Sequence, residues 1–212
     1  MKKLLFVLAI FGMLATTTTY AQNKALNKAL KKELSQKKKD FKKRGFQIFG
    51  TSRSLDVALL RYYEALEEGG DAVFEWVGYA TGKSKGLLVT AAENNARARY
   101  ATLAQSQIKG QIKQKMQANS ADVSEEEIDK FEAVYLTKVE AELKGLLKPS
   151  FSIIKTDEKT GVSDLETYYV VDETAAGKAR LAAAKRALEE ANIKSEAGDI
   201  ISSAAEEKVI PE

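Results

Sequence analysis

Apolar side chains recur at the spacing of an amphipathic helix in five stretches of this chain. The predicted helices cover residues 23–43, 54–67, 86–116, 124–148 and 174–193. Local signals support their ends: Ser54 is a good N-cap, Gly69 and Gly70 stop the second helix, and Ser124 with Glu127 has the spacing of a capping box. The short polar connection between the third and fourth helices predicts that they form an antiparallel hairpin.

Four shorter stretches are rich in β-branched and aromatic residues, which is typical of strands. They cover residues 46–51, 72–80, 150–155 and 165–172. Together the two patterns predict an α+β fold: one sheet of about four strands with helices mainly on one face, a long α-hairpin insertion and a separate N-terminal helix. Residues 194–212 show no clear periodicity, and we expect them to form a flexible C-terminal tail.

The first 21 residues have the pattern of a secretory signal. Two lysines precede an apolar run from Leu4 to Ala15, and small residues lead to a predicted cleavage point after Ala21. A run of about twelve residues is too short to cross a bilayer, which needs roughly 20. We therefore expect an exported protein. Its expected location is the periplasm, and the alternatives are a membrane-peripheral position or secretion.

The predicted organisation follows from these patterns. Residues 1–21 are the signal, 22–44 a basic amphipathic helix, 45–193 a single α+β domain and 194–212 the tail.

The chain contains neither cysteine nor histidine. A disulfide framework, a lipid-accepting cysteine, a Ser-His-Asp triad and a histidine-containing zinc site are all excluded. This composition favours a protein that is not an enzyme, and we expect no cofactor and no bound metal. A small-ligand carrier remains an alternative, which would need a pocket of a few hundred Å³.

Charge is distributed unevenly along the chain. Residues 22–44 hold ten Lys or Arg and two acidic residues, whereas residues 45–212 hold 21 basic and 28 acidic residues. A helix with this charge and an apolar line is suited to an anionic lipid or polymer surface. The candidate binding residues are Lys31, Lys32, Lys37, Lys38, Lys39, Lys42, Lys43 and Arg44. Export argues against nucleic acid as the partner, and an envelope protein is the other partner expected. The alternative is that the helix lies on its own acidic domain, with its leucines completing the core and its lysines merely solvated.

One segment partly matches a phosphate-binding loop. Gly82, Lys83 and Ser84 follow a predicted strand and precede a helix, and Asp172 ends another apolar strand, as a magnesium-binding acid would. However, the loop's first glycine should be at position 77, which is Val77. A phosphate- or nucleotide-handling enzyme that uses these residues is therefore the alternative function.

Two stretches resemble the LPP20-type family of small exported proteins of bacterial cell envelopes. Trp76–Ala80 followed by the Ala-rich segment Ala91–Ala104 is similar to a strand and helix of that family, and Glu166–Val171 followed by Ala182–Ala184 is similar to its late strand and terminal helix. The chain lacks the lipid-accepting cysteine that many members carry. The resemblance implies a non-catalytic structural or interaction role in the envelope.

Overall fold

The computed structural model describes residues 29–119, 124–193 and 195–205. The described part begins with a helix at residues 29–43, here called the basic helix. The following elements are β1 (Gln47–Phe49), α2 (Leu55–Gly69), the short 3₁₀ helix η1 (Gly70–Ala72), β2 (Val73–Gly82), α3 (Lys85–Asn119), α4 (Glu125–Glu142), β3 (Pro149–Thr156), β4 (Ser163–Asp172), α5 (Glu173–Ala191) and α6 (Ser195–Ala205). The predicted signal, residues 1–21, lies outside the described residues.

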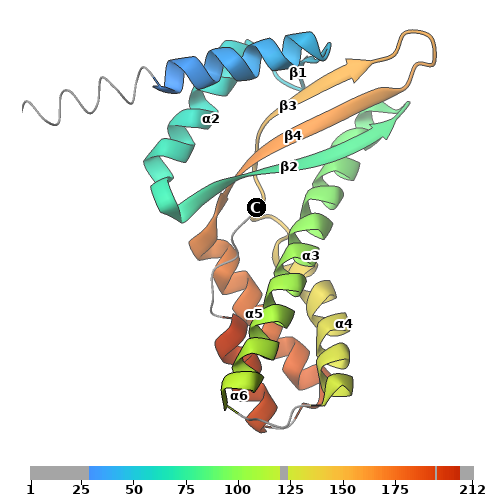
Figure 1. Cartoon of the computed structure of the whole chain (residues 1–212). Helices are drawn as coiled ribbons and strands as arrows, with labels where there is room; N and C mark the ends of the chain where they lie inside the picture. Colours follow the sequence, from blue (N-terminus) through green and yellow to red (C-terminus); the bar gives the residue numbers. More distant parts are fainter. Residues whose placement is uncertain (1–28, 120–123, 194, 206–212) are drawn as a thin grey trace, which may run out of the picture.

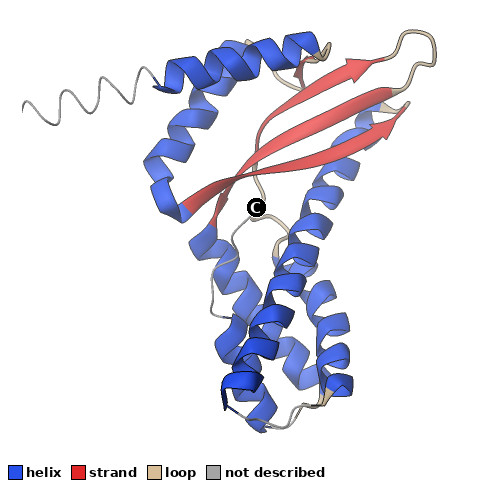
Figure 2. Cartoon of the chain, in the orientation of Figure 1, coloured by secondary structure: helices blue, strands red, loops and turns tan. Residues whose placement is uncertain are grey.

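The α+β class is confirmed, with one antiparallel sheet in the strand order β1-β3-β4-β2. Figure 2 shows the sheet at one end of the molecule and a bundle of helices at the other. The long helix α3 joins the two ends, because it packs on the sheet near its start and on α4 and α6 further along (Figure 1). The predicted antiparallel pair of α3 and α4 is present, and the capping box at Ser124 and Glu127 opens α4 as expected.

Helices cover both faces of the sheet rather than mainly one face. Side chains alternate between the faces along a strand, and β4 is apolar in both directions. Leu165 and Tyr169 belong to clusters that include α3, whereas Tyr168 packs with the basic helix and α2. A near-continuous apolar run is typical of a strand buried on both faces, so β4 carried this signal although the sequence analysis expected helices mainly on one face.

The first half of α3 lies very close to β2. A Cβ atom on Gly78 would lie 2.2 Å from the backbone oxygen of Ala92. Any residue other than glycine at this position would therefore push β2 and α3 apart. At the same contact the indole N–H of Trp76 donates to the backbone oxygen of Ala96 over 2.8 Å. The small residues of α3 therefore allow this approach, as their pattern predicted.

The prediction of a flexible tail from residue 194 is wrong for the described residues 195–205. They form α6, which packs against α3 and α5. Its buried side chains are Ala197, Ile200, Ile201, Ala204 and Ala205. These positions follow the spacing of an amphipathic helix, so the pattern was present in the sequence, although three of the five are small alanines. Residues 206–212 lie outside the described part.

Candidate functional site: the basic helix on the sheet

The basic helix is held against the sheet by an aromatic cluster. Phe41 is completely buried, and its ring centroid lies 5.5 Å from that of Tyr168 and 6.3 Å from that of Phe151. Leu34, one of the predicted apolar line, packs against the same cluster, and Tyr62 of α2 completes it. One side of the helix thus belongs to the protein's own core.

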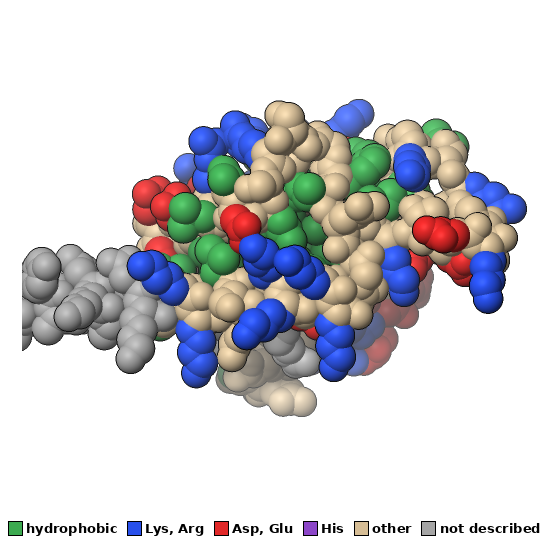
Figure 3. All heavy atoms as spheres, turned by 90° about the horizontal axis from the view of Figure 1, so that it is seen from above, with side chains coloured by type: hydrophobic (Ala, Val, Ile, Leu, Met, Phe, Trp, Pro, Cys, Tyr) green, Lys and Arg blue, Asp and Glu red, His purple; other side chains and the backbone are tan. Residues whose placement is uncertain are grey.

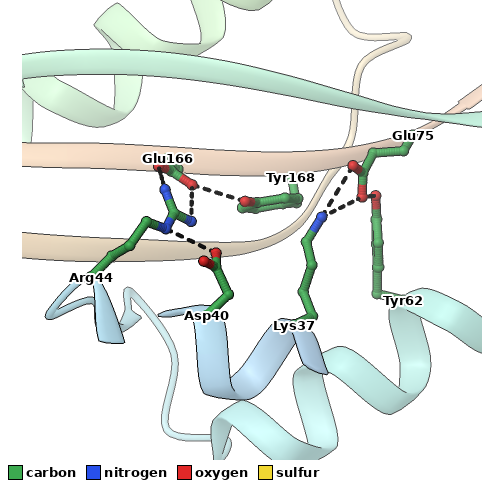
Figure 4. Close-up of polar contacts among 7 residues, drawn as sticks. All are labelled: Lys37, Asp40, Arg44, Tyr62, Glu75, Glu166 and Tyr168. Carbon is green, nitrogen blue, oxygen red and sulfur yellow. Dashed lines mark hydrogen bonds and ion pairs between the residues drawn. The ribbon is translucent and has the colours of Figure 1, made fainter. Parts of the chain in front are cut away.

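Three of the eight predicted binding residues form ion pairs with the protein's own carboxylates. Figure 4 shows two of these pairs, from Lys37 and Arg44. The Lys37 ammonium lies 3.2 Å from a carboxylate oxygen of Glu75, on β2. The Arg44 guanidinium donates two hydrogen bonds to Glu166 of β4, over 2.7 and 3.2 Å.

The third pair joins the basic helix to α2. The Lys38 ammonium donates to a carboxylate oxygen of Asp56 over 2.7 Å. Asp56, Glu75 and Glu166 were not predicted as partners, because they lie 18, 38 and 122 residues from the bases they bind. No local sequence signal identifies contacts at such separations.

Two tyrosines share the carboxylates that bind Lys37 and Arg44 (Figure 4). The Tyr168 hydroxyl donates to Glu166 over 2.8 Å, and the Tyr62 hydroxyl donates to Glu75. Burial of each phenol, together with the hydrogen bond to its carboxylate, raises the pKa of both tyrosines above the ordinary value of 10. Both therefore remain neutral hydrogen-bond donors, and the network fixes the helix in place rather than offering a reactive group.

The other five predicted residues face solvent. They are Lys31, Lys32, Lys39, Lys42 and Lys43. In the part of the chain that the structure describes, their ammonium groups make no hydrogen bond or ion pair. Figure 3 views the molecule from the side that carries the basic helix and shows Lys and Arg side chains standing out from it.

The two interpretations of the basic helix thus apply to different sides of it. The side toward the sheet packs on the domain, where its bases are paired with the domain's acids. The opposite side carries lysines that no group among the described residues neutralises.

The phosphate-binding alternative does not form a single site. Lys83 and Ser84 follow the end of β2, whose last residue Gly82 pairs with Ser163. Asp172 pairs with Val73 at the other end of the same two strands, nine residues away, which is roughly 30 Å at about 3.4 Å per residue. Asp172 also has a structural task, since its carboxylate accepts from two backbone N–H groups at the start of α5.

Two hollows of about 460 Å³ lie along α3 in the described part of the chain and are open to solvent. They do not support the small-ligand alternative, because neither would enclose a ligand. Among residues 29–119, 124–193 and 195–205, no group of three or more acidic side chains is placed to hold a metal ion. Over the same ranges, every helix is too short or too polar to cross a bilayer.

No family model, curated protein or solved structure matches this chain. The resemblance to LPP20-type proteins therefore remains a prediction.

Proposed function

We propose that this is an exported, non-catalytic protein of the cell envelope that docks on an anionic surface through the solvent side of its basic helix. The observation that carries the proposal is the separation of charges on that helix. Lys37, Lys38 and Arg44 bind the protein's own acids, whereas five lysines remain unpaired and exposed among the described residues. Export and the envelope location rest on the pattern of residues 1–21 and on the family resemblance.

The docked helix presents its charge without having to fold on the surface. A disordered basic segment loses conformational entropy when it binds, which weakens its net affinity. Here Phe41 already fixes the helix on the sheet. Each lysine near an anionic bilayer contributes about 1 kcal/mol, so five of them are enough for measurable binding that salt weakens.

The test compares two five-lysine variants of the protein beginning at residue 22. In the first, the exposed lysines of the basic helix become glutamine: Lys31, Lys32, Lys39, Lys42 and Lys43. In the control, five exposed lysines elsewhere become glutamine: Lys83, Lys85, Lys144, Lys178 and Lys185. Both variants lose the same net charge, so a difference between them reports position rather than total charge.

Co-sedimentation with vesicles containing phosphatidylglycerol gives the readout. We expect the parent and the control to pellet at low salt and to be released at high salt, and the helix variant to remain in the supernatant. Equal pelleting of the two variants would contradict the proposal. Failure of the parent to pellet would contradict it for lipid surfaces and direct the same comparison to acidic envelope polymers.

A further inference from the structure

Two arginines outside the basic helix line a small recess at the start of α2. The recess measures about 170 Å³ and is lined by Thr51, Arg53, Ala58, Arg61, Tyr62 and Ser150. Its lining joins the β1–α2 loop, α2 itself and the start of β3. Among its lining residues, Ala58 and Tyr62 are buried, whereas both arginines are exposed.

The recess carries positively charged hydrogen-bond donors and no negatively charged acceptor in its lining. Within the described part of the chain, neither the Arg53 nor the Arg61 guanidinium forms a hydrogen bond or an ion pair. This distinguishes both from Arg44, whose guanidinium is held by Glu166.

Size and chemistry together define what the recess can bind. Small-molecule pockets usually measure about 300–1,000 Å³, so this recess accommodates a single polar group rather than a whole metabolite. Guanidinium groups bind phosphate oxygens through paired, charge-assisted hydrogen bonds. The hydroxyls of Thr51 and Ser150 add donors that suit a tetrahedral oxyanion.

We propose that the recess formed by Arg53, Arg61, Thr51 and Ser150 binds a phosphate group, either free or carried by a lipid headgroup. This site is independent of the surface docking proposed above, because none of its residues lies on the basic helix.

The test uses inorganic phosphate as the probe, at constant ionic strength, followed by NMR of backbone amides in the protein beginning at residue 22. We expect saturable shifts centred on residues 50–54 and on Ser150. The variant Arg53→Gln/Arg61→Gln should bind phosphate at least about tenfold more weakly, because it loses the charged donors. The charge-matched control Lys178→Gln/Lys185→Gln, on α5, should bind as the parent does.

The five-lysine helix variant separates this proposal from the previous one. It should retain phosphate binding at residues 50–54 even where vesicle binding is lost. Equal phosphate affinity of the parent and the Arg53/Arg61 variant, or shifts spread evenly over all exposed bases, would overturn the site.

Vesicles containing phosphatidylglycerol then distinguish the source of the phosphate. Weaker vesicle binding by the Arg53→Gln/Arg61→Gln variant than by the Lys178→Gln/Lys185→Gln control identifies a lipid headgroup as the ligand. Equal vesicle binding, with phosphate affinity still lost, identifies free phosphate.

Discussion

Replacing Phe41 by alanine should release the basic helix from the sheet while the remaining domain stays folded. Phe41 has no exposed surface and packs between Phe151, Tyr168 and the Arg44 guanidinium, whose central carbon lies 5.5 Å from the ring centroid. Removing a buried phenylalanine ring typically costs about 3–5 kcal/mol. That cost applies first to the docking of the helix, because Phe41 is its only fully buried described side chain.

The ion pairs of the helix cannot compensate for this loss. Lys37 with Glu75, and Lys38 with Asp56, are partly exposed, and such pairs contribute about 0–1 kcal/mol each. Only the Arg44–Glu166 pair has a nearly buried partner, with 10% of the Glu166 side chain exposed. A loss of about 3–5 kcal/mol therefore raises the population of the open helix by roughly 10²- to 5 × 10³-fold.

Trypsin provides a direct assay, because the basic helix is rich in its cleavage sites. We expect Phe41→Ala to accelerate cleavage within residues 29–44 by at least about two orders of magnitude, with the circular dichroism of the domain largely retained. The control is Leu60→Ala on α2, since 48% of Leu60 is exposed and its loss should leave cleavage unchanged. Cleavage of Phe41→Ala at the parent rate would refute the assignment of Phe41 as the anchor. Cleavage throughout the chain would refute independent release of the helix.

Two further predictions concern the other face of the sheet and the effect of pH. Gly78→Ala should lower the free energy of unfolding by several kcal/mol, because its Cβ would collide with the backbone of α3. Gly110→Ala has free space around it and should raise the free energy of unfolding by about 0.5–1 kcal/mol. Urea unfolding of both variants compares them, and equal effects would contradict the close contact at Gly78. Burial raises the pKa of Tyr100 from 10 to about 12, so the folded protein keeps a proton that the unfolded chain loses between these values. Tyr100 by itself should thus leave stability unchanged below pH 10 and lower it by up to about 3 kcal/mol as the pH rises to 12, and Tyr62 and Tyr168, whose pKa is also raised, should lower it further. Urea unfolding across that range measures the fall, and a constant midpoint would contradict it.

Local signals predicted the elements well where side chains and backbone act within a few residues. Ser54 and Ser124 cap α2 and α4 as expected, and the aromatic stretches form the four strands. The prediction failed at α6, a short helix whose buried face, with Ile200 and Ile201, packs against other helices. Isolated helices of this length are marginal in water, so only packing settles the outcome.

The candidate site shows the same limit. The sequence predicted a basic helix, which is present over residues 29–43, because a concentration of lysines is a local property, and the binding role of its eight candidate residues stays a prediction. It did not separate the five lysines that are unpaired among the described residues from the three paired bases, since the partners come from α2, β2 and β4. It gave no indication of Arg53 and Arg61 as a pair, because their recess exists only where the β1–α2 loop and α2 meet the start of β3.

By itself, the sequence determined the α+β class, the caps, the uneven charge and the absence of cysteine and histidine chemistry, because these depend on composition and on short-range periodicity. The tertiary structure alone decided which helices cover the two faces of the sheet, which bases are neutralised and where, among the described residues, two unpaired arginines lie around a recess. Those features arise from contacts between residues far apart in the chain, and their free energies depend on distance and burial, which exist only once the chain has folded.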